Sequence, residues 1–195
     1  SKSSCELFCD TSIFIDANTG IQGDKEDTGE EVFNTKLMYG YKRLPFFWKP
    51  KSNHNIQSAL IFESNNIDES VNSKIDYASA SPTAYDGHKL YRYYADEPGK
   101  VDKYSIHERH SIVRLCLKLG TRIIGFSIYT TTVNDMSADA GINFEKLCRD
   151  SFFNERTDEG YTMSGMVVIH FPADHGCEGF VGKYGESVSG NPTED

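Results

Sequence analysis

The segment GFVGKYGESVSG, residues 179 to 190, carries the residue types best suited to binding a ligand. Its four glycines allow a ligand or a neighbouring strand to approach the backbone closely. Tyr184 offers a ring for stacking, Glu186 a charged acceptor and Ser189 a hydroxyl. Backbone groups, a few acceptors and one aromatic ring suit a shallow polar site. We therefore expect Tyr184, Gly185, Glu186 and Ser189 to line a non-covalent binding site, with a tight turn at Gly185.

Histidine and cysteine side chains are the candidates for catalysis or metal binding. His107 and His110 have metal-like spacing for a helix, but we expect their segment, HERH, to precede a strand, where such residues face opposite sides. His170 and His175 lie near Cys177, as a cysteine nucleophile would require, although a buried cysteine with solvated histidines is the more common arrangement. No G-x-S-x-G, H-E-x-x-H or phosphate-loop motif occurs. The sequence predicts no enzyme, no metal site and no cofactor.

An acidic stretch near the N-terminus invites a calcium-loop interpretation. Asp24, Glu26 and Gly29 fall at loop positions 1, 3 and 6. Position 12 should hold a bidentate glutamate, and Thr35 stands there instead. We therefore expect a solvated loop in this stretch.

Composition narrows the class of protein. The chain has 195 residues, 38% of them hydrophobic and 25% charged, which suits one large domain or one domain with an arm. The net charge of −9 disfavours nucleic acid as a partner. No apolar run is long enough for a transmembrane segment, and no signal peptide is visible. The five cysteines are widely spread, and the sequence leaves the compartment open.

Aromatic and basic residues alternate in LMYGYKRLPFFWKPKSN, where Trp48 follows Phe46 and Phe47. Such a segment can stack on sugars or bases, or it can pack beneath a proline-bounded loop. We favour packing in the core.

Alternating hydrophobic residues predict several strands. IQSALIFES and HKLYRYYADEPGK each contain one short strand. The clearest pattern is SIVRLCLKLGTRIIGFSIYTTT, in which apolar residues alternate on both sides of Gly120-Thr121. Glycine at the first position of a two-residue loop predicts a β-hairpin on a type II′ turn. The apolar face of this hairpin comprises Val113, Leu115, Leu117, Leu119, Ile124, Phe126 and Ile128.

One helix and one further strand follow. GINFEKLCRDSFFNE places Phe144, Leu147, Cys148, Ser151 and Phe152 on one helical face. MVVIHF alternates again, with Val167 and Ile169 facing one way, before a proline ends the run.

The C-terminal run MVVIHFPADHGCEGFVGKYGESVSG resembles the closing segment of jacalin-related lectins. That family ends with a strand, a proline, a turn, a glycine-phenylalanine pair and a G-[KR]-x-G-[DE] run, followed by an aspartate. The matching positions are Gly179, Phe180, Gly182, Lys183, Gly185 and Glu186. Ser189 replaces the aspartate that accepts sugar hydroxyls in the family, and a neutral hydroxyl is a weaker acceptor than a carboxylate.

The resemblance implies an all-β fold, a β-prism of Greek-key sheets with one short inserted helix. Residues 1–53 would be an N-terminal arm or elaboration, and residues 54–195 the jacalin-like domain. The implied function is non-catalytic binding of a carbohydrate or glycoconjugate, so the expected partner is a glycan or glycoprotein. The alternative is a β-prism that has lost sugar binding and serves protein interaction or assembly, with a protein partner or as a homo-oligomer.

Overall fold

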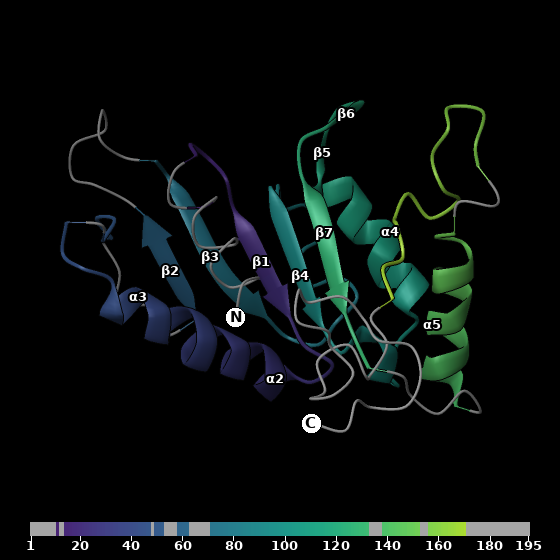
Figure 1. Ribbon diagram of the computed structural model, residues 1–195, viewed down its shortest axis with the longest axis horizontal. Coiled ribbons are helices and arrows are strands. Elements are labelled where there is room, and N and C mark those ends of the chain that lie inside the picture. The colour runs from purple at the N-terminus through teal and green to yellow at the C-terminus, as the bar shows by residue number, and fades with distance from the viewer. Residues whose placement is uncertain are drawn as a thin grey trace, which may run out of the picture. The chain divides into compact units, whose positions relative to one another are not determined.

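The computed structural model describes residues 11, 14–47, 49–52, 58–62, 71–132, 138–152 and 156–170. Contacts divide the chain into two compact units, residues 1–147 and 148–195. The first unit is built on a five-stranded mixed sheet with the order β2-β3-β1-β4-β7 (Figure 1). Its strands are β1 (Thr19–Gln22), β2 (Ala59–Phe62), β3 (Ser73–Ala78), β4 (Arg92–Asp96) and β7 (Phe126–Thr130). Strand β1 runs parallel to β3 and β4, and β4 runs parallel to β7, whereas β2 is antiparallel to β3.

The prediction of an all-β β-prism is wrong. Parallel pairing requires crossover connections, and helices supply two of them here. Strand β1 lies between β3 and β4, so a strand from within residues 1–53 occupies the centre of the sheet. All four residues of β1 are buried, as expected when helices cover both faces of a parallel sheet.

Continuous helical segments cover one face of the sheet. These are α2 (Glu26–Glu31), the π-helical η1 (Val32–Met38) and α3 (Tyr39–Arg43). Figure 1 shows these segments lying along one face of the sheet. Their apolar side chains form a core with the strands, which comprises Ile21, Val32, Phe33, Leu37, Met38, Tyr41, Leu60, Phe62, Ile75 and Tyr94. The solvated calcium-like loop predicted for residues 24 to 35 is therefore wrong, because most of that stretch is helix.

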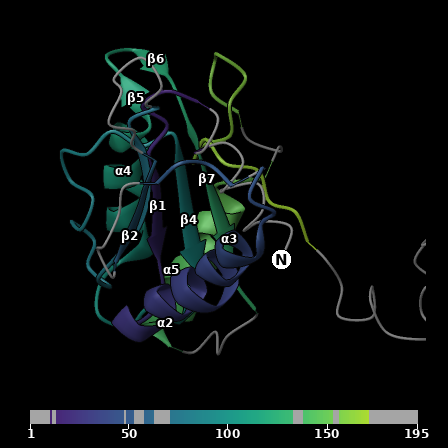
Figure 2. The same cartoon turned by 90° about the vertical axis from the view of Figure 1, so that its left-hand side faces the viewer.

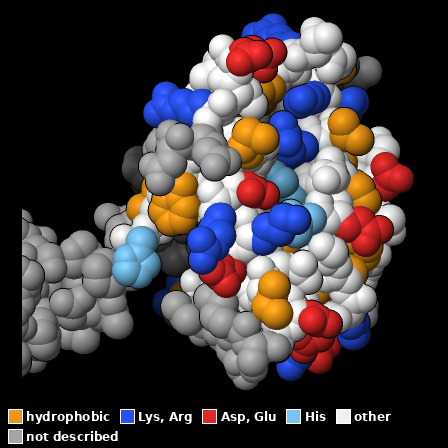
Figure 3. Space-filling model, turned by 90° about the vertical axis from the view of Figure 1, so that its right-hand side faces the viewer, with side chains coloured by type: hydrophobic (Ala, Val, Ile, Leu, Met, Phe, Trp, Pro, Cys, Tyr) orange, Lys and Arg blue, Asp and Glu red, His pale blue; other side chains and the backbone are white. Residues whose placement is uncertain are grey.

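Helix α4 (Ile106–Cys116) covers the opposite face, and the sheet separates it from α2 and α3 in Figure 2. The side chain of Ser105 caps this helix by accepting a hydrogen bond from the backbone N–H of His107. A second core lies beneath α4 and comprises Tyr85, Leu90, Tyr93, Ala95, Val113, Cys116 and Leu117. Seen from the right-hand side of Figure 1, basic and acidic side chains are interspersed (Figure 3).

The predicted hairpin is only partly present. Strands β5 (Lys118–Leu119) and β6 (Arg122–Ile123) pair across Gly120-Thr121. Gly120 has a φ of +60° whereas Thr121 has no positive φ, as a type II′ turn requires. The first arm of the prediction is wrong, because residues 113 to 116 belong to α4. Leu115 and Leu119, which the prediction placed on the apolar face of the hairpin, are 67% and 61% exposed.

Other predicted elements have mixed outcomes. The strands in IQSALIFES and HKLYRYYADEPGK are confirmed as β2 and β4, and the helix in GINFEKLCRDSFFNE as α5 (Asp139–Arg149). The strand predicted in MVVIHF is wrong over residues 166–170, which contain no strand. Phe46 and Phe47 are 88% and 69% exposed, so the prediction that they pack in the core is wrong. None of the described helices is long and apolar enough to cross a bilayer.

Candidate ligand site at the carboxyl edge of the sheet

The order of the parallel strands marks one place in the first unit as a candidate site. From β1 the chain crosses to β3 on one side of it, and then returns to β4 on the other. In open α/β sheets, ligands bind outside the carboxyl ends of the strands where the strand order reverses in this way. We call this region the carboxyl edge; it comprises Gln22 to Thr28, Asp96 to Lys100 and Thr130 to Thr132.

Gln22, the last residue of β1, organises the backbone around this edge. Its buried amide donates from Nε2 to the carbonyls of Ser79 and Ser81, 2.6 Å away in each case. Its Oε1 accepts a 2.6 Å hydrogen bond from the hydroxyl of Tyr93 on β4. The side chain therefore ties the end of β1 to the segment after β3 and to β4. Because the polar atoms of Gln22 are paired within the protein, this side chain stabilises the carboxyl edge and is not itself a candidate ligand-binding group.

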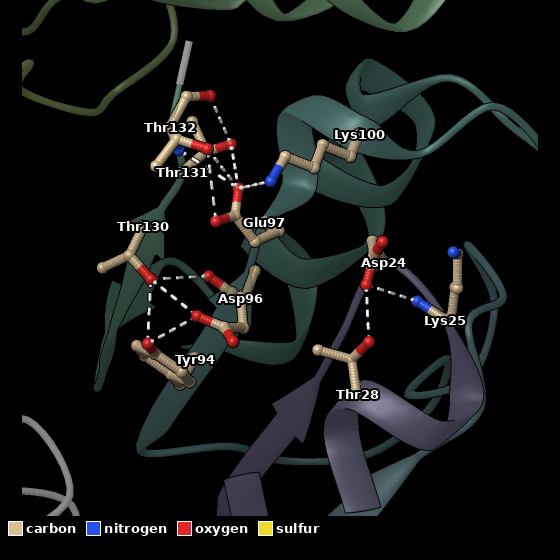
Figure 4. A network of polar contacts seen from close by, with 11 residues as sticks. Asp24, Lys25, Thr28, Tyr94, Asp96, Glu97, Lys100, Thr130, Thr131 and Thr132 are labelled. Atoms are coloured by element: carbon tan, nitrogen blue, oxygen red, sulfur yellow. Dashed lines mark hydrogen bonds and ion pairs between the residues drawn. The ribbon is translucent and has the colours of Figure 1, made fainter. Parts of the chain in front are cut away.

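The turn after β1 is tight and begins helix α2. A Cβ on Gly23 would lie 2.6 Å from Cβ of Thr28 and 2.7 Å from the backbone nitrogen of Gly29. Only glycine fits such a close approach without displacing backbone. The next residue, Asp24, accepts hydrogen bonds at Oδ1 from the backbone N–H of Lys25 and from the Thr28 hydroxyl (Figure 4). The carboxylate of Asp24 thereby accepts hydrogen bonds from two donor groups at the start of α2.

Asp96 occupies the corresponding position at the end of β4. Its Oδ1 accepts hydrogen bonds from the hydroxyls of Tyr94, at 3.0 Å, and Thr130, at 3.2 Å (Figure 4). Burial raises the pKa of Tyr94 to about 12, so its hydroxyl stays protonated and can donate at neutral pH. Within the described part of the chain, Oδ2 of Asp96 has no hydrogen-bond partner. The half-buried carboxylate therefore has one oxygen held by the protein and one available as an acceptor.

Glu97 follows in a left-handed backbone conformation, with φ of 52° and ψ of 42°. A non-glycine residue in this region stores strain, and such residues concentrate at functional sites. Its carboxylate joins β4 to the end of β7 through the Thr131 hydroxyl and the backbone N–H and hydroxyl of Thr132, and it pairs with Lys100 at 3.2 Å (Figure 4). Burial alone would raise the pKa of Glu97, but the hydrogen bonds and Lys100 outweigh burial and lower it.

A buried cation lies beneath the same edge. Arg109 on α4 is fully buried, and its Nη2 donates to the carbonyl of Gly23 at 3.2 Å. Its Nε and Nη1 have no hydrogen-bond partner. The guanidinium lies 4.8 Å from the ring centre of Tyr104. Burial raises the pKa of Tyr93 and Tyr129, and the positive charge of Arg109 lowers both in part.

The sequence-predicted site residues Tyr184, Gly185, Glu186 and Ser189 lie outside the described residues, as do His175 and Cys177. The expectation that Tyr184, Gly185, Glu186 and Ser189 bind a ligand stays a prediction. His107 and His110 lie in helix α4 rather than before a strand, so the expected geometry of HERH is wrong. Nδ1 of His110 lies 3.3 Å from the Tyr129 hydroxyl. No group of three metal-ligating side chains occurs among the described residues.

The sequence interpretation missed the carboxyl edge, although one signal for it was present. Asp24 lies two residues after the end of strand β1, and Asp96 ends strand β4 with Glu97 directly after it. Acidic residues directly after buried strands are typical of sites at the carboxyl ends of parallel strands. The threonines Thr130 to Thr132 occupy the same position after β7.

No known family model matches the chain, and no curated protein matches its sequence. The function must therefore be inferred from the geometry of the chain itself. The carboxyl edge offers three carboxylates that accept from hydroxyl donors, those of Asp24, Asp96 and Glu97, together with a row of threonine hydroxyls and the cations Lys100 and Arg109. Carboxylates and hydroxyls held in place in this way can accept and donate hydrogen bonds to a polar ligand.

Proposed function

We propose that this chain is a non-catalytic binding protein that recognises a hydroxyl-rich ligand, a carbohydrate or glycoconjugate, at the carboxyl edge. The observation that carries the proposal is the arrangement of Asp24 and Asp96 at the ends of the adjacent parallel strands β1 and β4. In each carboxylate, Oδ1 accepts two hydrogen bonds from the protein. These bonds fix the orientation of each carboxylate and leave Oδ2 for a ligand.

The pairing register supports a common site for the two carboxylates. Gln22 lies opposite Ala95 in the β1–β4 ladder, so Gly23 and Asp96 leave the sheet side by side, and Asp24 follows one residue later on the β1 side. A carboxylate oxygen accepting from a sugar hydroxyl forms a charge-assisted hydrogen bond, which is stronger than a bond between neutral groups. The hydroxyls of Thr130 and Thr132 can supply further polar contacts. This combination suits a polyhydroxyl ligand better than an apolar one.

The test is a glycan-array screen of the purified chain, with Asp96→Asn and Tyr184→Ala screened alongside the wild type. The amide is nearly the same size as the carboxylate, so Asp96→Asn removes the charge with little change in packing. Binding that is lost in Asp96→Asn and kept in Tyr184→Ala supports a site at the carboxyl edge. The reverse pattern would place the site in residues 179–190, as the lectin resemblance implies. No binding to any glycan would refute carbohydrate recognition.

A second candidate function is protein interaction, and one observation favours it. Apolar side chains are exposed around the end of α4 and the hairpin, where Leu115, Leu119 and Ile123 are 67%, 61% and 59% exposed. The hairpin projects from the sheet beside the start of β7 rather than its carboxyl end (Figure 1). Exposed apolar side chains that cluster in this way are typical of protein contacts. A Leu119→Ser/Ile123→Ser variant would lose such a partner while keeping any glycan binding.

A further inference from the structure

Arg109 is the largest fully buried side chain in the described part of the chain, and it is a cation with unsatisfied donors. Its Nη2 donates to the carbonyl of Gly23, while Nε and Nη1 have no hydrogen-bond partner. Buried cations are normally paired with an anion, because removing a charge from water is costly unless an opposite charge compensates. No carboxylate forms an ion pair with Arg109 among the described residues.

The acidic residue next to Gly23 does not provide this compensation. Asp24 directs Oδ1 to the backbone N–H of Lys25 and the hydroxyl of Thr28, both on the α2 side. The groups that surround the guanidinium are instead neutral. They include the Gly23 carbonyl, the ring of Tyr104 and the hydroxyls of Tyr93 and Tyr129, and a hydrogen bond from the guanidinium helps to lower the pKa of Tyr93. Aromatic rings and a single carbonyl balance a positive charge less well than an anion does.

A second unsatisfied donor lies beside the first. The hydroxyl of Tyr104 is buried and has no hydrogen-bond partner, and its ring is the one that contacts Arg109. A hydroxyl and two guanidinium nitrogens without acceptors thus occur together at the junction between β1 and α4. Buried donors are rarely left unpaired in native structures, and each such group requires an explanation.

We propose that Arg109 and Tyr104 form a subsite for an oxyanion, the phosphate or carboxylate group of a ligand, at the carboxyl end of β1. An oxyanion would accept from Nε or Nη1 of Arg109 and from the Tyr104 hydroxyl, and would neutralise the buried charge. The inference goes beyond the proposed function, because it involves none of the hydroxyl-binding carboxylates and names a different chemical group. A failed glycan screen would leave it standing.

The experiment is a thermal-shift and calorimetric titration of the full chain with inorganic phosphate, and separately with acetate, at constant ionic strength. Wild type should show a saturable rise in melting temperature with at least one of the two anions. Phosphate acting alone would assign a phosphate ligand, and acetate acting alone a carboxylate ligand; either result supports the subsite. The absence of any saturable shift with both anions would overturn it.

Three variants separate an oxyanion subsite from a merely structural arginine. Tyr104→Phe keeps the ring and removes only the unsatisfied hydroxyl, so it should fold normally and weaken anion affinity by about threefold to tenfold. Arg109→Gln should weaken it by at least about tenfold. Arg114→Gln, an exposed position on the same helix, is the matched control and should leave affinity unchanged. Equal anion affinity in wild type and Tyr104→Phe, or equal anion affinity in wild type and Arg109→Gln, would contradict the proposal.

Discussion

Replacing Gln22 with leucine tests whether the carboxyl edge is held together by this side chain. The amide makes three hydrogen bonds of 2.6 Å, two to carbonyls and one from the Tyr93 hydroxyl. A net contribution of about 1 kcal/mol for each bond gives a loss of about 3 kcal/mol. The orphaned Tyr93 hydroxyl adds to this cost, and the more apolar leucine offsets about 1 kcal/mol. We expect Gln22→Leu to lower the free energy of unfolding by about 2–4 kcal/mol.

The assay is urea unfolding followed by circular dichroism, with Tyr93→Phe and the double variant measured together. Tyr93→Phe should cost about 1–1.5 kcal/mol, since it leaves Oε1 of Gln22 without its donor. The double variant should cost about 1 kcal/mol less than the sum of the two single variants, because both remove the same bond. A loss below about 1 kcal/mol for Gln22→Leu, or strictly additive effects, would refute the reasoning.

Two further predictions follow from the residues around the edge. Gly23→Ala should destabilise the fold, because its Cβ would meet backbone atoms of Gly29 and Lys25 at 2.7 and 2.8 Å. Gly40 lies in helix α3 with open space around it, so Gly40→Ala should instead raise the free energy of unfolding by about 0.5–1 kcal/mol. If urea unfolding shows the same loss of stability for Gly23→Ala and Gly40→Ala, the close packing at Gly23 is contradicted. The lowered pKa of Glu97 means that its stabilisation is complete above the ordinary pKa of 4.5 and is lost as the pH falls through the lower folded-state pKa. Melting temperatures recorded from neutral to acidic pH should therefore fall less steeply for Glu97→Gln than for wild type, and identical slopes would show that Glu97 is not linked to folding.

Part of the architecture was predictable from local sequence patterns. Strand β4 ends where Pro98 and Gly99 follow it, and α5 has the apolar spacing of a helix. The turn at Gly120-Thr121 was also predictable, since glycine is favoured where φ is positive. These features depend on residues within one element, so the sequence expresses them directly.

Helix α4 was predicted as a strand because its sequence alternates apolar and polar residues. SIVRLCLKL alternates apolar and polar residues, which indicates a strand, but the buried positions recur at helical spacing as Ile106, Arg109, His110, Val113 and Cys116. Two of these buried residues are polar, so a hydrophobicity pattern alone could not find them. The run SIHE, with Ser105 and Glu108 three apart, was the missed signal, because it has the form of a capping box.

The candidate site depends on tertiary structure and was less accessible. Asp24 and Asp96 are far apart in the sequence, and only the parallel pairing of β1 with β4 brings the ends of their strands together. The burial of Arg109 depends on α4 packing against the sheet beside Gly23. An arginine in an ordinary amphipathic pattern would be expected at the surface, so its sequence position carried no sign of its role.

The measurement that decides most directly whether the carboxyl edge binds a carbohydrate is a calorimetric titration of a glycan identified by the array. It would be carried out with wild type, Asp96→Asn and Asp86→Asn, the last an exposed aspartate in the loop before β4 that serves as the control. We expect Asp96→Asn to weaken binding by at least about tenfold, as the loss of a charged acceptor should, and Asp86→Asn to bind as wild type does. Unchanged affinity in Asp96→Asn would contradict a carbohydrate site at the carboxyl edge.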